Sequence, residues 1–328
     1  MAPLAAALAL ALLAATVAIV LDAAVSHKPL VPRQPAIATW LAGPGERLTY
    51  RVFLTLLLVA SGAYAGLLAL GARGRAAEFR RPAVVLVAAL QLAVFAGPIL
   101  LSTDVFSYIA YARMGVEHGL NPYLHGPASI RTDPIFRYVG EVWRHVATAY
   151  GPVYTLLTYP LAPLGVVGAL WGMKAIALLA SAGTLALTWR CARRRGIEPV
   201  FALLAVGANP LYVIYGLGGA HNDLLMMLVM MAAVALTLAP RPSARSEAGA
   251  GALIVAGALI KATVAALLPF MLIARRRPSE LVGAVAALAG FAVLAYAAFG
   301  VHGLDIVAAL NRDAALVSSD SFATEIAH

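Results

Sequence analysis

The polar stretch 102–108 (Ser-Thr-Asp-Val-Phe-Ser-Tyr) interrupts a very apolar sequence and contains a carboxylate that could act as a base. It directly follows an uncharged run at 82–101 that is long enough to cross a bilayer. A carboxylate where a hydrophobic helix leaves the membrane is costly unless water, a partner or a substrate meets it. Asp104 and Tyr108 have helical spacing and share one face of a predicted helix. Asp104 is predicted either as a catalytic carboxylate or as an N-cap that only starts the helix.

A second group of polar side chains, His221, Asn222 and Asp223, follows a glycine-rich turn and precedes an apolar run at 223–239. Asn222 or Asp223 could simply cap that run as a helix. Three consecutive polar groups exceed what a cap requires, so they are also candidates for binding a substrate. A helix N-terminus favours anions, although Asp223 itself opposes an anion there.

Lys261 lies between Ile260 and Ala262, where two short apolar segments, 249–260 and 262–274, meet. A lysine at membrane depth is costly and normally has a partner or a function. It could extend its ammonium to the membrane surface, or it could contact a phosphate as a point charge. Lys174 lacks this context and is predicted to be paired or to reach the surface in the same way.

The composition defines a polytopic membrane protein. Of the 328 residues, 62% are hydrophobic and 12% are charged, whereas a soluble domain has about 25% charged residues. The net charge of +9 is typical of loops that face anionic lipid and does not indicate nucleic-acid binding. Cys191 is the single cysteine, so no intramolecular disulfide and no zinc-binding cysteine pattern is predicted. We expect one transmembrane domain over 1–328.

About nine transmembrane helices are predicted, because a span needs about 20 apolar residues. The candidates are 3–21, 50–71, 82–101, 164–189, 199–217, 223–239 and 279–299, with 249–260 and 262–274 as a short hairpin. The first run lacks a basic flank and is interpreted as a span, not as a signal peptide. The segment 151–163 is predicted not to cross.

Charge distribution predicts the orientation of these spans. With a cytoplasmic N-terminus, more than half of the 24 Lys and Arg residues fall in four short cytoplasmic loops, as the positive-inside rule requires. These loops are 73–81, 190–195, 241–245 and 275–277. Most carboxylates and all seven histidines then lie on the outer side. Because these groups perform acid–base chemistry near neutral pH, the candidate site is predicted on the outer face.

The large outer segment 102–150 contains most of the remaining candidates. Arg113 lies in its first helix, and Asn121 and Tyr123 belong to a Gly-Leu-Asn-Pro-Tyr turn at 119–123. Apolar residues recur with helical spacing over 134–149, so an amphipathic helix is predicted there, either on the membrane surface or in a solvent-facing loop. The first outer loop, 22–49, has no interpretable pattern.

Several motifs together resemble the polyprenol-phosphomannose-dependent α-1,6-mannosyltransferases, which are GT-C integral-membrane glycosyltransferases. They are the stretch 102–108, the turn 119–123, Tyr-Gly-Pro at 150–152, Asn-Pro at 209–210, Gly-Ala-His-Asn-Asp at 219–223 and the Lys261 hairpin. The resemblance covers roughly residues 80–300. It implies an all-α GT-C-like bundle whose large outer loop carries interfacial helices.

The resemblance also implies a function in cell-envelope glycan synthesis at the plasma or inner membrane. The donor would be a polyprenyl-phosphate sugar, most simply mannose, and the acceptor a glycan or glycolipid. Asp104 matches the presumed catalytic aspartate of the family and would deprotonate the acceptor, with inversion at the anomeric carbon. Lys261 or Arg113 could balance the departing phosphate. The substrate-binding candidates are Tyr108, Arg113, Asn121, Tyr123, His221, Asn222, Asp223 and Lys261.

Two departures from the family and one alternative function remain. Family members usually have more spans after the point where this sequence stops, so a shortened or partial chain is implied. The acceptor is left open, since the first outer loop matches nothing. No cofactor and no metal are expected, although Asp104 and Asp223 could meet around an ion. The alternative is a transporter with a broken-helix site around Lys261.

Overall fold

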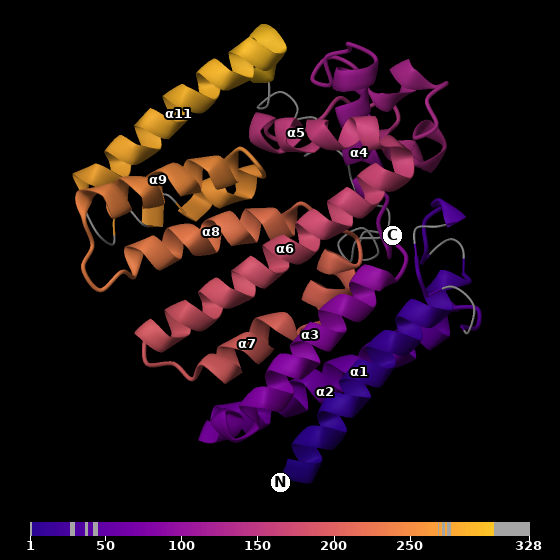
Figure 1. Ribbon diagram of the computed structural model, residues 1–328, viewed down its shortest axis with the longest axis vertical. Coiled ribbons are helices and arrows are strands. Elements are labelled where there is room, and N and C mark those ends of the chain that lie inside the picture. The colour runs from indigo at the N-terminus through magenta and orange to yellow at the C-terminus, as the bar shows by residue number, and fades with distance from the viewer. Residues whose placement is uncertain are drawn as a thin grey trace, which may run out of the picture.

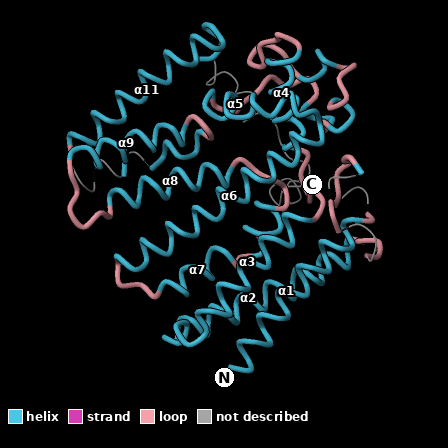
Figure 2. Tube along the Cα trace, in the orientation of Figure 1, coloured by secondary structure: helices cyan, strands magenta, loops and turns pink. Residues whose placement is uncertain are grey.

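The computed structural model describes residues 2–26, 30–36, 39–41, 45–267, 269–270, 273 and 277–304. These residues form helices joined by loops, without a strand, which confirms the all-α prediction (Figure 2). Arg275, Arg276 and several residues of 262–274 lie outside the described residues. The predicted second helix of the hairpin is therefore described only in part.

Four described helical segments are long and apolar enough to cross a membrane. They contain α1 (Ala2–Ala24), α2 (Tyr50–Leu70), α6 (Gly165–Arg194) and α11 (Pro278–Phe299). At about 1.5 Å rise per residue, helices of this length span the roughly 30 Å hydrocarbon core. The chain is therefore a membrane protein, as its composition indicates.

The remaining helices of the bundle are shorter or broken. They are α3 (Arg80–Ala96), α7 (Pro199–Gly207), the π-helix η8 (Leu211–Leu217), α8 (Asp223–Thr237), α9 (Ala244–Ala258) and the 3₁₀ segment η9 (Ala262–Ala266). The pair α7 and η8 bends by 48° at Asn209-Pro210 and would count as a fifth span. Proline removes a helical hydrogen bond, which accounts for the break. The predicted count of about nine spans is not confirmed by the described residues.

One large core joins residues from Ala5 to Ile260. Figure 1 shows α6 crossing the middle of the bundle, with α1, α2, α3 and α7 on one side and α8, α9 and α11 on the other. Gly251 of α9 and Gly283 of α11 permit close packing, because a Cβ at either would meet the other helix's backbone. Lys174 of α6 is buried and paired, with its ammonium donating to Gly97 O at 2.7 Å.

Basic residues join the helix ends on the side of the bundle away from α4 (Asp104–Glu117) and α5 (Pro152–Thr158). Arg80 lies over the Trp189 ring at 5.0 Å, and Arg194 donates to Ala235 O at 2.6 Å. These contacts bring together the ends of α2–α3, α6 and α8. Figure 1 shows α4 and α5 at the other end of α6.

Short turns surround α4. They are η4 (Pro127–Ile130), η5 (Phe136–Tyr138), η6 (Glu141–Trp143) and η7 (Tyr159–Leu164), with η2 (Gly71–Arg75), η3 (Ala76–Phe79) and η10 (Gly300–Leu304) elsewhere. The helix α4 is predicted correctly, but most of its residues are buried in protein. α5 and η7 are too short to cross a bilayer alone.

The predicted amphipathic helix at 134–149 is wrong. The segment contains only the short turns η5 and η6, separated by extended backbone at Val139 and Gly140. Ile135 and Val139 are buried, whereas Val142 of the same predicted face is 64% exposed. Tertiary contacts with α4 override the helical period, and Gly140 fits where a Cβ would collide with Thr103 Oγ1.

Candidate functional site

The start of α4 places the Asp104 carboxylate at the edge of the protein interior. Leu101, just before the polar stretch, has φ of 63°, a costly conformation for a non-glycine residue. Ser102 Oγ accepts from Asp104 N at 3.1 Å. Thr103 occupies the N-cap position and Asp104 the first helical position, so the predicted N-cap interpretation of Asp104 does not hold.

The turn before α8 places His221 in the interior. Ala220 has φ of 48° and, with Leu101, is one of two described non-glycine residues with positive φ. His221 is buried and stacks on Tyr215 with ring centroids 4.5 Å apart. A Cβ on Gly219 would collide with the His221 ring, which explains the glycine. Asn222 stands at the N-cap of α8 but makes no side-chain capping bond.

The two strained segments lie against each other. Leu100 N donates to Gly218 O at 3.0 Å, so the backbone before Asp104 is tied to the turn before His221. His221 Nδ1 lies 3.6 Å from Asp104 Oδ2. One helical turn further along α4, the Tyr108 hydroxyl donates to Asn222 Oδ1 at 3.4 Å. The polar stretch and the His-Asn-Asp sequence therefore form one cluster.

Lys261 extends this cluster from a third part of the chain. Its ammonium donates to both Asp223 carboxylate oxygens, at 2.7 and 2.8 Å. The side chains are 37% and 36% exposed, so the pair is accessible. Gly151 of the Tyr-Gly-Pro motif lies against Leu259, where a Cβ would collide with the carbonyl. This close approach holds the end of α9, and with it Lys261, beside α5.

The pKa values of Asp104 and His221 are shifted in opposite directions. Burial raises the pKa of Asp104, and this outweighs the opposing effects of His221 and Ser102. Burial also lowers the pKa of His221, despite the nearby Asp104 and Asp223 carboxylates. Asp104 is therefore a stronger base than an exposed aspartate, and the histidine favours its neutral form. Neighbouring ionisable groups whose pKa values are shifted by burial are typical of functional sites.

Several polar atoms of the cluster are buried without a hydrogen-bond partner among the described residues. They are His221 Nε2, Asn222 Nδ2 and Ser107 Oγ. Buried polar groups in folded proteins are nearly always satisfied, so these atoms are available to bind water or a ligand. Among all the residues that the structure describes, no group of three or more His, Cys, Asp or Glu residues has metal-binding geometry.

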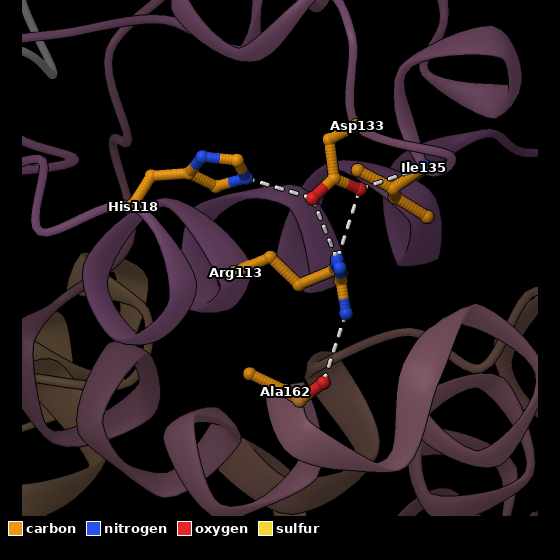
Figure 3. A network of polar contacts seen from close by, with 5 residues as sticks. All are labelled: Arg113, His118, Asp133, Ile135 and Ala162. Carbon is orange, nitrogen blue, oxygen red and sulfur yellow. Dashed lines mark hydrogen bonds and ion pairs between the residues drawn. The ribbon is translucent and has the colours of Figure 1, made fainter.

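Arg113, predicted as a substrate contact, belongs to a different network (Figure 3). Its Nε donates to both Asp133 oxygens at 2.9 and 3.0 Å, and its Nη1 donates to Ala162 O at 3.0 Å. His118 Nε2 lies 2.8 Å from the same carboxylate. Arg113 is nine residues beyond Asp104 on α4, about 13 Å along the helix axis. This network joins α4 to the turns that surround it.

Asn121 and Tyr123 also make contacts within the fold. Asn121 donates to Phe299 O at 2.8 Å and accepts from Tyr123 N at 3.0 Å. The Tyr123 hydroxyl donates to Tyr150 O at 2.8 Å. The turn thereby ties α11 to the segment that precedes α5. The structure brings Asp104, Tyr108, His221, Asn222, Asp223 and Lys261 together, and it places Arg113, Asn121 and Tyr123 in supporting positions.

Two aromatic residues, Tyr150 and Tyr154, and one acid, Asp133, belong to these networks but are not predicted as site residues from the sequence. The Tyr108 ring packs edge-on against Tyr150 and Tyr154 at 4.8 and 5.1 Å. Asp133 is buried at the centre of the second network. The Tyr-Gly-Pro motif was a usable signal for Tyr150, whereas nothing in the local sequence distinguishes Asp133.

The fold and the site together define an all-helical membrane protein with a strained acid–base cluster at one end of its helix bundle. The chain belongs to the family described as "Alpha-(1->6)-mannopyranosyltransferase, N-terminal domain", whose model matches residues 4–277. This finding confirms the resemblance to α-1,6-mannosyltransferases. No solved structure matches the chain.

Two curated relatives illustrate the similarity. Alpha-(1->6)-mannopyranosyltransferase A of Mycobacterium tuberculosis is 31% identical over 256 residues, which cover 75% of this chain and 46% of that protein. The protein of the same name in Corynebacterium glutamicum is 34% identical over 181 residues, which cover 54% of this chain and 35% of that protein. The chain thus spans less than half the length of either relative in these matches.

Proposed function

We propose that this chain carries the catalytic site of a membrane mannosyltransferase. It would transfer mannose from a polyprenyl-phosphate donor to a glycan or lipid-linked acceptor on the outer face of the membrane. The observation that carries this proposal is the convergence of Asp104, His221, Asp223 and Lys261 from three parts of the chain. Family membership favours this function over the transporter alternative.

Asp104 would act as the general base. Its carboxylate would take the proton from an acceptor hydroxyl while that oxygen attacks the anomeric carbon of the donor. The bond from that carbon to the phosphate oxygen breaks, and the lipid phosphate departs as an anion that needs no general acid. Attack opposite the leaving group inverts the anomeric configuration. The raised pKa of Asp104 brings its basicity closer to neutral pH, where general bases are most effective.

His221 and Lys261 would support this step. The His221 imidazole lies next to the Asp104 carboxylate and can stabilise its orientation. Lys261 lies in the same cluster and would keep the Asp223 carboxylate from repelling a departing phosphate. Its pairing with Asp223 fixes the position of the ammonium and partly neutralises it. The net positive charge available to the phosphate from this pair is therefore small.

A transfer assay tests the proposal. The full chain in lipid nanodiscs would receive polyprenyl-phosphate mannose, labelled in the sugar, and a mannose-containing acceptor. We expect labelled acceptor whose new bond has the anomeric configuration opposite to that of the donor, as measured by NMR. A folded chain that gives no transfer, or a product that retains the donor configuration, would contradict the proposal.

Sidedness is tested by cysteine labelling in intact cells. Ala128→Cys lies in the segment that surrounds α4, and Ser243→Cys lies in the α8–α9 connection among the basic residues. We expect a membrane-impermeant thiol reagent to label the first variant from outside and the second only after permeabilisation. The native Cys191 is buried and provides a low background. The reverse labelling pattern would overturn the orientation and the outer-face site together.

A further inference from the structure

A small cavity opens directly beside the start of α4. Its volume is about 150 Å³, and three arginines contribute to its wall. We call it the arginine pocket and define it by Arg33, Thr103, Arg137, Gly140, Glu141 and Arg144. Thr103 is the neighbour of Asp104, so this pocket borders the candidate active site. The mechanism proposed above uses none of its arginines.

Hydrogen bonds hold Arg33 in place from both sides. Leu101 N donates to Leu30 O at 2.9 Å. Ile99 N donates to Gln34 Oε1 at 2.8 Å, and Gln34 Nε2 donates back to Ile99 O at 3.2 Å. The first outer loop is therefore fastened to the segment that leads into α4. Arg33 lies between these attachment points and is kept close to Thr103.

Arg137 is held by aromatic packing. Its guanidinium lies 4.9 Å from the centre of the Tyr138 ring. Tyr138 in turn packs against Phe106 in the first turn of α4, with ring centroids 5.6 Å apart. Gly140 lies so close to Thr103 that a Cβ would collide with the hydroxyl. These contacts fix the wall of the pocket against α4.

Arg144 has unused hydrogen-bonding capacity. Its guanidinium lies 5.1 Å from the centre of the Phe136 ring, and its backbone carbonyl accepts from Ala128 N at 2.6 Å. The Nε nitrogen is buried and has no hydrogen-bond partner among the described residues. A buried charged donor without a hydrogen-bond partner destabilises the folded protein, because its lost hydration is not replaced. A ligand that accepts hydrogen bonds would remove this cost.

The charge and size of the pocket select the kind of ligand. Three arginines and one glutamate, Glu141, line the pocket, so its net charge favours an anion. Guanidinium forks match the geometry of phosphate oxygens and can bind them bidentately. Pockets for whole drug-sized ligands have volumes of about 300–1,000 Å³. A volume of about 150 Å³ lies below this range and suits a small anionic group such as a phosphate.

We propose that the arginine pocket binds the phosphate group of a lipid substrate, one residue away from Asp104. The Lys261 ammonium is occupied by Asp223, whereas the arginines offer an excess of positive charge. Phosphate bound there would hold the lipid at the mouth of the candidate site. The identity of the lipid rests on the proposed function, but binding of a lipid phosphate does not.

Binding is measured with the full chain in phosphatidylcholine nanodiscs, without any acceptor. The probes are labelled polyprenyl phosphate and, as the uncharged counterpart, labelled polyprenol. We expect polyprenyl phosphate to bind at least tenfold more tightly than polyprenol. Arg144→Gln should weaken the binding of polyprenyl phosphate at least tenfold. Arg144→Lys should retain part of the affinity, because it keeps the positive charge but loses the bidentate guanidinium geometry.

Arg131→Gln is the matched control, because Arg131 is an exposed arginine of the same outer segment that does not line the pocket. It should change the affinity less than twofold. Arg137→Gln serves as a second pocket variant if Arg144→Gln fails to fold. Equal losses in Arg131→Gln and Arg144→Gln would indicate general surface charge and overturn the pocket. Unchanged affinity in a folded Arg144→Gln or Arg137→Gln variant, or equal binding of polyprenol, would overturn it as well.

Two further measurements identify the class of lipid that binds and distinguish phosphate binding from catalysis. Phosphatidylinositol in the nanodisc competes if the pocket takes a glycerolipid headgroup, while only polyprenyl phosphate competes if it takes the donor; either result supports a phosphate site. Asp104→Asn should bind polyprenyl phosphate normally. If the wild-type chain binds polyprenyl phosphate normally but transfers no mannose, the proposed function is contradicted and the phosphate site is still supported.

Discussion

Both ends of α4 carry charged clusters, and the two clusters are built in opposite ways. Around Arg113, the buried Asp133 carboxylate accepts hydrogen bonds from a guanidinium and a backbone amide and lies next to His118. Those hydrogen bonds lower the pKa of Asp133 in spite of its burial. Around Asp104, burial raises the pKa, the His221 contact is long and the flanking backbone is strained.

This difference separates structure from chemistry. A carboxylate whose oxygens already accept several hydrogen bonds and whose pKa is lowered is a poor base, and those hydrogen bonds stabilise the folded protein. A carboxylate with a raised pKa, few hydrogen bonds and a strained approach costs stability and gains reactivity. We therefore expect substitutions near Asp104 to change transfer and substitutions near Asp133 to change folding.

Apart from Asp104 itself, the largest loss of transfer is expected at Lys261. Lys261→Gln leaves the Asp223 carboxylate as an unpaired negative charge in the cluster, which would repel the departing phosphate anion. Removal of one electrostatic group typically lowers turnover by about 10²-fold. Lys261→Arg keeps the charge and should recover part of that loss. Full transfer by Lys261→Gln in the mannosyltransferase assay would show that the ion pair only closes the turn.

His221→Ala should lower transfer at least tenfold, while the protein still inserts and folds. It should also move the pH profile. The carboxylate form of Asp104 is the active base, so transfer falls as pH drops through the Asp104 pKa. At pH values low enough to protonate His221, its charge lowers the pKa of Asp104, so removal of His221 should shift the acidic limb of the profile to higher pH. An unchanged limb with normal kinetics would remove His221 from the site.

Asp133→Asn should have the smallest effect on turnover and a clear effect on stability. The variant loses the charged hydrogen bonds to Arg113 and His118, which costs about 2 kcal/mol. Because the pKa of Asp133 is lowered in the folded protein, its stabilising contribution is present at neutral pH and lost as pH falls through the folded-state pKa. The stability of the variant should therefore fall less at acidic pH than that of the wild-type protein. Thermal unfolding in detergent at several pH values measures both effects.

A drop in transfer per folded molecule for Asp133→Asn, without a loss of stability, would erase the distinction between the two clusters. Arg131→Gln in the same outer segment provides a control for changes in surface charge.

Sequence reasoning identified the helical membrane class and most of the polar groups that converge. Apolar length predicts helices such as α1 and α6 because the bilayer imposes that length. Asp104, His221 and Lys261 were recognisable because charged or titratable side chains beside apolar runs are costly. Each of these signals is local, and the structure confirms the helices on which they depend.

The pairings were not predictable, because they join distant parts of the chain. The sequence predicts that Lys261 either reaches the membrane surface or contacts a phosphate, whereas in the structure its ammonium donates to Asp223. Arg113 is a candidate because its charge could balance a phosphate, whereas in the structure it donates to Asp133, a partner that carries no local signal in the sequence. The helical period at 134–149 failed because packing against α4 and the close approach of Gly140 to Thr103 override it.

The most direct test of the account is Asp104→Asn, measured for both thermal stability and transfer. Asparagine keeps the size of the side chain but cannot accept the acceptor's proton. Loss of a general base lowers transfer by about 10²–10⁴-fold, or about 3–5 kcal/mol of barrier. We predict this collapse with unchanged or slightly raised stability, because a buried, poorly hydrogen-bonded charge is removed. Reduced stability with normal transfer per folded molecule would contradict the account and leave Asp104 with a structural role.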